Sequence, residues 1–145
     1  MYNKTQKAFT MIELIFVIII IGMLSAIAIP KLSSTVDLAY MTKGKSTLAS
    51  VRTALATERQ KQILRGNTSP ITIYNASGRV FTRFTDNNGS RILDNDLPSC
   101  TTIGCWSVDT GIYTFYTGGT SNCTYTVTSN RFVDSTSDGC SELEE

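Results

Sequence analysis

Residues 9–30 read FTMIELIFVIIIIGMLSAIAIP, and this stretch decides the fold. It is apolar almost throughout, it ends at Pro30, and Glu13 is its only charged residue. About 20 apolar residues are enough to cross a bilayer as an α-helix, so residues 9–29 have the length of a transmembrane segment. A carboxylate in hydrocarbon is costly, so Glu13 is a candidate functional residue that needs a partner.

The segment before this stretch, MYNKTQKA, is short and polar and carries Lys4 and Lys7. Positive charges before an apolar segment favour a cytoplasmic N-terminus, with the rest of the chain outside. One interpretation is a secretory signal cut near Ala26-Ile27-Ala28, although Glu13 interrupts its apolar region. A second is a plain membrane anchor. A third is a leader cut before Phe9, which leaves the whole hydrophobic stretch on the mature chain.

Beyond Pro30, residues 31–65 contain no proline and are rich in Ala, Leu, Lys, Arg and Gln, which are good helix formers. Leu48, Val51 and Leu55 recur at steps of three and four, which predicts an apolar stripe that packs on a domain. Gly66 is a plausible helix end. We therefore predict one helix over residues 9–65, which Pro30 should bend or locally unwind.

After Gly66 the composition changes to Ser, Thr, Asn and Gly, with short runs of alternating β-type residues. The predicted strands are residues 71–74, 80–84, 112–117, 123–128 and 131–133. An antiparallel sheet of three or four strands on the helix stripe would bury the apolar sides of both. Residues 66–145 are thus predicted to form a β-rich head, and the chain an α+β fold.

The composition excludes several classes of function. The chain has 145 residues and a formal net charge of +1; roughly 115 residues beyond the apolar stretch can form one small core. It has no histidine, which excludes histidine-dependent triads and metal sites. No nucleophile–base set, metal cluster or phosphate-binding loop is visible. We expect no enzyme activity, catalytic residue, metal or cofactor.

All four cysteines lie in the last third of the chain: Cys100, Cys105, Cys123 and Cys140. An even number behind an export-type N-terminus indicates disulfides formed in an oxidising space. Four cysteines allow three pairings, and the spacing favours the local one, 100–105 and 123–140. A zinc site of four thiolates and a redox-active pair are the alternatives, although the chain has no C-x-x-C pair.

Residues 7–32, KAFTMIELIFVIIIIGMLSAIAIPKL, resemble the N-terminus of type IV pilins and of the pseudopilins of type II secretion. The family pattern is a short basic leader, a small residue, F-T-[LM]-I-E, an apolar run and a proline. Ala8 stands where the family usually has glycine. The resemblance implies that residues 1–8 are a prepilin leader, cut between Ala8 and Phe9, and that Phe9 is then N-methylated.

The resemblance also implies the fold and the function. The fold would be pilin-like, a long helix whose first half is transmembrane, with a disulfide-bonded β-sheet head. The chain would be a structural subunit of a type IV pilus or a type II secretion pseudopilus. The alternative is an exported, disulfide-bonded binding domain with a conventional signal peptide, whose mature chain would begin near Ile29.

Partners and location follow from the same resemblance. The chain would bind other pilin or pseudopilin subunits, membrane lipid before assembly, the prepilin peptidase and methyltransferase, and an inner-membrane assembly platform with its ATPase. It would sit in the bacterial inner membrane with its N-terminus cytoplasmic and its head periplasmic, and then in a periplasmic or cell-surface filament.

The resemblance also implies a role for Glu13, because in this family the glutamate of one subunit is thought to meet the terminal amine of its neighbour. Pairing across subunits would select one axial register among apolar helices. The alternative is that Glu13 pairs with the amine of its own Phe9. The apolar stretch would first hold the unassembled subunit in the membrane and would later pack against other subunits in the filament core. The alternative is that it is a permanent membrane anchor.

Weaker patterns lie in the head and on the second half of the helix. The family implies a disulfide-bounded C-terminal loop, which here would be closed by Cys123 and Cys140. Some pseudopilins bind calcium in such a loop, but Asp134, Asp138 and Glu142 match no EF-hand and a solvated acidic tail is the alternative. Basic residues on the helix would fit contact with nucleic acid, although nearby acids dilute the charge, which favours a solvated face. These basic residues are Lys43, Lys45, Arg52, Arg59, Lys61 and Arg65.

Overall fold

The computed structural model describes residues 9–85, 89–119, 122–135 and 140–144. The predicted leader, with Ala8, and Asp138 of the acidic loop lie outside the described residues. The chain forms two compact units, Met1–Val36 and Asp37–Glu145.

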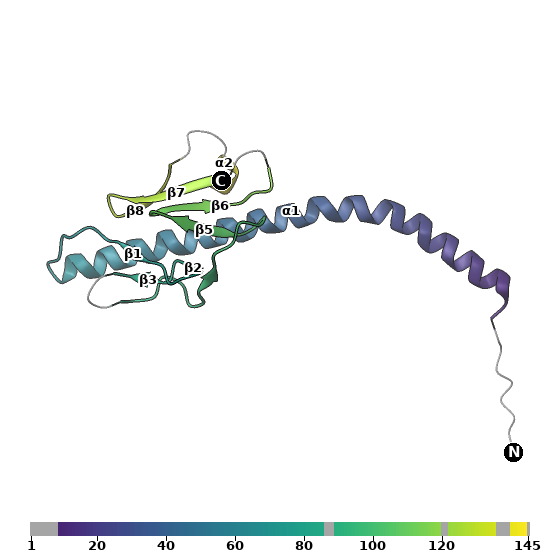
Figure 1. The fold of residues 1–145 in the computed structure, drawn as a ribbon, viewed down its shortest axis with the longest axis horizontal. Coiled ribbons are helices and arrows are strands. Elements are labelled where there is room, and N and C mark those ends of the chain that lie inside the picture. Colours follow the sequence, from purple (N-terminus) through teal and green to yellow (C-terminus); the bar gives the residue numbers. More distant parts are fainter. Residues whose placement is uncertain (1–8, 86–88, 120–121, 136–139, 145) are drawn as a thin grey trace, which may run out of the picture. The chain divides into compact units, whose positions relative to one another are not determined.

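One long helix precedes a series of short strands and a final helical turn (Figure 1). The elements are α1 (Met11–Leu64), β1 (Ile73–Tyr74), β2 (Arg79–Val80), β3 (Arg83–Phe84), β4 (Leu97–Pro98), β5 (Trp106–Asp109), β6 (Ile112–Phe115), β7 (Cys123–Thr128), β8 (Arg131–Asp134) and α2 (Ser141–Glu144). This arrangement confirms the predicted α+β class, with a long N-terminal helix and an antiparallel β-rich head.

The helix predicted over residues 9–65 is observed over Met11–Leu64. Gly66 follows it with a φ of 72°. The Gly66 N–H donates to the Ile63 carbonyl at 2.9 Å and the Asn67 N–H to the Gln62 carbonyl at 2.9 Å. This is a Schellman cap, which satisfies the last carbonyls of the helix and favours glycine at the left-handed position.

Pro30 lies inside α1, and the residues on both sides of it are helical. The sequence predicts a bend or local unwinding at Pro30, and these neighbouring residues show no local unwinding. A bend at Pro30 stays a prediction.

The largest sheet has the strand order β5-β6-β7-β8, and all its pairs are antiparallel. Two of its hairpins close with two-residue turns. Thr110 and Gly111 have φ of 46° and 85°, and Ser129 and Asn130 have φ of 52° and 62°. Two successive positive φ angles suit a type I′ turn, whose twist matches that of paired strands.

The core of the head lies between this sheet and the C-terminal half of α1. The predicted stripe of Leu48, Val51 and Leu55 is buried, and it belongs to one cluster with aromatic residues of the head. The aromatic members are Phe81, Phe84, Trp106, Tyr113, Phe115, Tyr125 and Phe132. Gly44 marks a close approach of helix and sheet, because a Cβ there would meet the Phe115 ring at 2.6 Å.

The four-stranded sheet confirms the predicted antiparallel sheet of three or four strands, and the head contains two smaller sheets besides it. Short pairs of β1 with β3 and of β2 with β4 accompany the four-stranded sheet. The run predicted over residues 80–84 is broken at Phe81, whose φ of 54° interrupts the extended backbone. Strand β5 was not predicted, although it forms one edge of the main sheet.

Two disulfides join Cys100 to Cys105 and Cys123 to Cys140, each with a Cα–Cα distance of 5.5 Å. This is the local pairing that the spacing favours. Because all four sulfurs are used, the alternative of a four-thiolate zinc site is excluded in this structure. The Cys123–Cys140 bond ties β7 to the residue that precedes α2.

Candidate assembly site on the N-terminal helix

The first turn of α1 is fixed by a cap from Thr10. The Glu13 N–H donates to Thr10 Oγ1 at 3.3 Å, and the Leu14 N–H donates to the Thr10 carbonyl at 3.2 Å. Thr10 is therefore the N-cap and Glu13 the third helical residue, the spacing of a capping box. An acid in the first turn is also favoured by the positive end of the helix dipole.

This cap gives Glu13 a local role that was not predicted from the sequence. The pattern that could have revealed it is T-x-x-E before an apolar run, which is a recognised helix start. At this position of a helix a glutamate side chain can accept from the N-cap N–H and is favoured by the helix dipole, whether or not a neighbouring chain is present. An effect of Glu13 on assembly can therefore come from its charge or from its capping role, and the two need separate tests.

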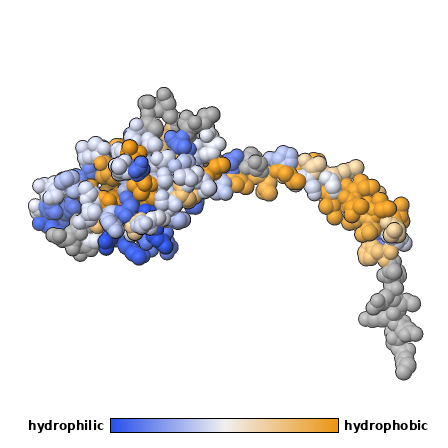
Figure 2. All heavy atoms as spheres, in the orientation of Figure 1, coloured by the Kyte–Doolittle hydropathy of each residue, from blue (hydrophilic) through white to orange (hydrophobic). Residues whose placement is uncertain are grey.

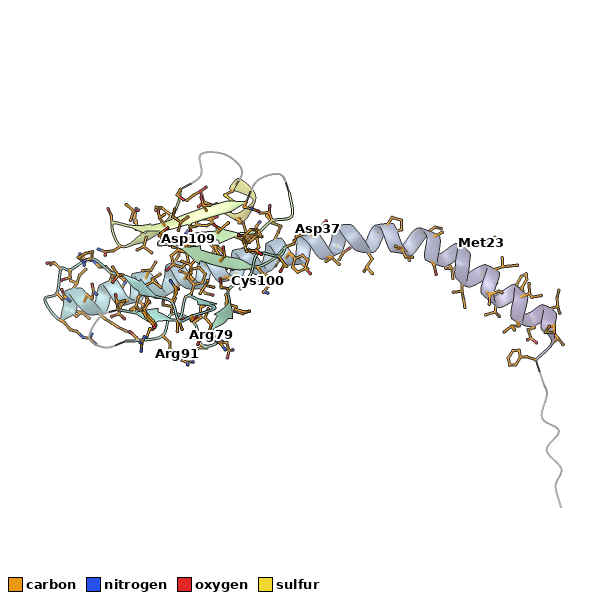
Figure 3. All side chains as sticks on the ribbon, viewed as in Figure 1. Met23, Asp37, Arg79, Arg91, Cys100 and Asp109 are labelled. Atoms are coloured by element: carbon orange, nitrogen blue, oxygen red, sulfur yellow. A yellow bond between two sulfur atoms is a disulfide. The ribbon has the colours of Figure 1, made fainter. Side chains whose placement is uncertain are left out.

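Apolar side chains from Phe9 to Ile29 are exposed on the helix to an unusual degree. Every large one among them is between 42% and 80% exposed, whereas Leu48, Val51 and Leu55 are at most 2% exposed. Figure 2 shows these hydrophobic residues gathered along the N-terminal part of α1, and Figure 3 shows Met23 projecting from it. A soluble monomer rarely presents an apolar surface this large, so the surface requires a partner.

This part of α1 is long and apolar enough to cross a membrane. A helix that is hydrophobic on all sides suits lipid or the interior of a bundle. The side-chain hydroxyl of Ser25 donates to the Ile21 carbonyl at 2.7 Å, so this polar group is satisfied within the helix. Glu13 carries the only charge between Phe9 and Pro30, and its neutralisation is therefore the main polar requirement of this surface.

The predicted site residues fall into two groups. Phe9 lies two residues before α1, Glu13 lies in the first turn of α1, and Pro30 lies further along the same helix. The four cysteines lie in the second unit, where they hold the head together. Ala8 lies outside the described residues. The side chains of the first group offer apolar contact and one charge, that of Glu13.

An apolar helix with one acid in its capped first turn, followed by a disulfide-bonded, β-rich head, defines a pilin-like class of α+β protein. Comparison with known proteins supports this class at the same residues. Residues 3–29 match the family described as the prokaryotic N-terminal methylation motif.

Two curated relatives extend the similarity beyond the motif. The chain is 34% identical over 99 residues, 68% of its length, to the type IV major fimbrial protein FimA of Dichelobacter nodosus. It is 32% identical over 102 residues, 61% of its length, to a fimbrial protein of Pseudomonas aeruginosa. No solved structure matches the chain. The family model and these two relatives support the assignment of the chain to the type IV pilin family.

The matched regions span 54% of FimA and 66% of the Pseudomonas aeruginosa protein. The chain thus spans between about half and two thirds of the length of these relatives. Both are named as fimbrial proteins, which is consistent with a chain that is not an enzyme.

Proposed function

We propose that this chain is a structural subunit of a type IV pilus and that it assembles through residues 9–30. The observation that carries the proposal is the apolar surface of α1, exposed from Phe9 to Ile29. The names of the two fimbrial relatives favour a pilus over a secretion pseudopilus.

The same apolar surface serves two successive environments under this proposal. In the membrane, residues 9–29 are solvated by lipid, and the subunit stays there until it assembles. In the filament, they pack against the same segment of other subunits, so protein contacts replace lipid contacts. Because lipid is as apolar as these side chains, the exchange gains little from the hydrophobic effect and depends on packing and on polar pairing.

Glu13 supplies that polar pairing. Removal of residues 1–8 would create a new α-amine at Phe9, four residues before Glu13. The amine of one subunit and the carboxylate of the next neutralise each other in a medium where either alone is costly. Docking is then best in the one axial register that joins the two charges.

Processing enzymes, an assembly machinery and a membrane location complete this proposed function. A prepilin peptidase would cut between Ala8 and Phe9 and would be followed by, or include, a methyltransferase that acts on Phe9. An inner-membrane platform and its ATPase would drive assembly. The unassembled subunit would span the bacterial inner membrane with its head in the periplasm, and the assembled filament would reach the cell surface.

A substitution series at Glu13 tests the register role and separates it from capping. Glu13→Gln keeps a capping side chain but removes the charge, whereas Glu13→Ala removes both. Intersubunit pairing predicts that both variants insert into the membrane normally and that both lower filament yield at least about tenfold, the effect of about 1.4 kcal/mol per docking step. Yield is measured as sheared surface filament per membrane-bound subunit.

The matched control is Thr10→Val, which removes the cap hydroxyl but leaves the charge. We expect this variant to retain most of its assembly. Full assembly of Glu13→Gln together with loss in Thr10→Val would contradict the register role and assign Glu13 to helix capping.

A further inference from the structure

A groove of about 690 Å³ lies between α1 and β8, the strand at one edge of the largest sheet. Figure 1 shows β8 beside the C-terminal part of α1. Apolar side chains of both elements line the groove, Leu55 and Ala56 from α1 and Phe132 and Val133 from β8. Leu55 and Phe132 are buried and Ala56 is exposed, so the groove has an apolar floor that can be reached from solvent.

The backbone of β8 directs hydrogen-bonding groups to the open side of the sheet. The Ser135 N–H donates to the Thr124 carbonyl of β7 at 2.9 Å, and hydrogen-bonded positions alternate along antiparallel strands. Phe132, three residues earlier, therefore points its N–H and its carbonyl away from β7. The Arg52 Nε–H donates to this carbonyl at 3.1 Å, in agreement with that direction. The Phe132 N–H thus lies at the open edge, where an added strand would pair.

Three arginines also line the groove: Arg52, Arg59 and Arg131. Arg52 is paired with Glu144, but the ion pairs of the described residues include neither Arg59 nor Arg131. Arg59 donates to the Ser69 carbonyl at 3.5 Å, a long hydrogen bond that does not neutralise its charge. Two positive charges of the groove are therefore not offset by a carboxylate within the described residues.

These two arginines lie toward the same end of the groove. Arg131 directly follows the turn between β7 and β8, and Asn130 Oδ1 of that turn accepts from the Ile71 N–H at 2.7 Å. Ile71 lies beyond the C-terminus of α1, so the turn lies toward that end of the helix, as Arg59 does. Arg52 precedes Arg59 by seven residues, about 10.5 Å along the helix axis, and marks the other end.

We propose that this groove binds an extended peptide segment of another protein, with an acidic residue at the C-terminal end of the segment. The segment adds to β8 as an antiparallel strand, because every pair in this sheet is antiparallel and such pairs are the more stable kind. An antiparallel segment ends beside Arg131, where the two arginines can hold its carboxylate through charge-assisted hydrogen bonds.

The dimensions of the groove suit such a segment. Three extended residues span about 10 Å, close to the separation of Arg52 and Arg59 along the helix. Alternate side chains of the segment would cover the apolar floor. A free phosphate or an acidic saccharide would use the two arginines but would leave the strand edge and the apolar floor unused.

This role is separate from the proposed assembly through residues 9–30, because the groove lies in the second unit of the chain. A subunit with an altered groove should therefore still insert into the membrane and assemble. Loss of peptide binding and loss of assembly are distinguishable outcomes.

The test measures the fluorescence anisotropy of a labelled peptide, Thr-Val-Thr-Val-Glu with an amidated C-terminus, on addition of the full chain in a non-ionic detergent. We expect Arg59→Gln and Arg131→Gln each to weaken binding at least about fivefold, because each removes a charge-assisted hydrogen bond. Ala56→Leu should weaken binding at least about fivefold by filling the floor while all charges stay in place.

Two matched controls separate this recognition from general attraction between charges. The peptide Glu-Val-Thr-Val-Thr has the same composition and charge, and it should bind at least about fivefold more weakly because its carboxylate lies at the wrong end. Arg79→Gln removes the same charge from an exposed position on β2 that does not line the groove, and it should change affinity less than about twofold.

Four outcomes would overturn the proposal. The first is the absence of peptide binding by the unaltered chain. The second is an equal loss of affinity in Arg79→Gln, which would indicate attraction to net charge alone. The third is equal affinity for the two peptides, which would exclude antiparallel addition to β8. The fourth is self-association of the chain that Ala56→Leu abolishes and the peptide does not displace, which would assign the groove to a second copy of this chain.

Discussion

Phe81 has a left-handed backbone conformation, with φ of 54°, that bulky side chains seldom adopt. Its N–H donates to Asn75 Oδ1 at 2.8 Å, and its ring stacks on Tyr113 with the centroids 4.7 Å apart. Asn75 in turn donates to the Tyr113 hydroxyl at 2.9 Å. One amide side chain therefore holds both the strained backbone and its aromatic partner.

Tyr125 provides a prediction at the scale of one ionisable group. Burial, with a smaller contribution from the negative charges of Asp134 and Glu144, raises its pKa from 10.0 to about 12, against an opposing effect of Arg52. The folded state thus favours the neutral phenol. The stabilisation is fully present below pH about 10, the unfolded pKa, and is lost as pH rises towards 12.

Titration of tyrosinate absorbance checks this prediction. We expect Tyr125 to titrate later than the exposed tyrosines, together with Tyr113, whose pKa burial also raises. Tyr125→Phe should remove part of the late phase and reduce the loss of stability above pH 10. A titration curve of unchanged shape in that variant would contradict the assignment.

At the scale of elements, the packing of α1 on the sheet depends on Gly44. A methyl group there would lie 2.6 Å from the Phe115 ring and 2.9 Å from Leu143. We expect Gly44→Ala to lower the free energy of unfolding by about 1–3 kcal/mol, the cost of overpacking a well-packed core. The measurement is thermal or denaturant unfolding of the full chain in detergent, followed by the fluorescence of Trp106.

The control for this prediction is the other glycine in α1. A methyl group added at Gly22 would meet no atom within 4 Å. Gly22→Ala should leave the unfolding of the head unchanged, because it adds helix propensity without a clash. Equal stability of the two variants would show that helix and sheet do not approach as closely as described.

The two disulfides differ in the length of chain that they close. Cys123 and Cys140 are 17 residues apart, and Cys100 and Cys105 are 5 apart. In the chain-entropy model the longer loop contributes about 3 kcal/mol and the shorter about 2 kcal/mol. Replacing Cys123 and Cys140 by alanine should therefore destabilise the head more than replacing Cys100 and Cys105, as measured by denaturant unfolding. A larger loss of stability in the Cys100 and Cys105 variant would contradict this assignment. In a separate test, alkylation of the unaltered, non-reduced protein should modify no thiol.

Periodicity and glycine placement predicted the long elements well because their causes are local. The apolar stripe at Leu48, Val51 and Leu55 lies on one helix face, and Gly66 caps the helix. Strand β5 was missed because its residues, WSVD, carry little alternation and depend on pairing with β6. The break at Phe81 was missed because the side chain of another residue, Asn75, holds it.

The same distinction between local and long-range causes applies to the candidate assembly site. The apolar run and Glu13 could be recognised in the sequence because apolar side chains are costly to expose to water and a carboxylate is costly to place in hydrocarbon. The Thr10 cap was also encoded locally and could have been predicted from T-x-x-E.

At the level of the complete chain, the two units differ in how their apolar residues are covered. Met1–Val36 carries an apolar surface that only lipid or other helices can cover, whereas Asp37–Glu145 buries its own core and is closed by disulfides. A subunit of this kind can polymerise through its first unit without changing the fold of its second. The proposed assembly therefore requires that the mature protein keep residues 9–30.

The most direct measurement is the N-terminal residue and intact mass of the protein recovered from membranes and from sheared filaments. We predict a mature chain that begins at N-methylated Phe9 and retains Glu13 and Pro30 in both fractions. A mature chain that begins near Ile29, or one that keeps residues 1–8 in the filament, would contradict assembly through the N-terminal helix.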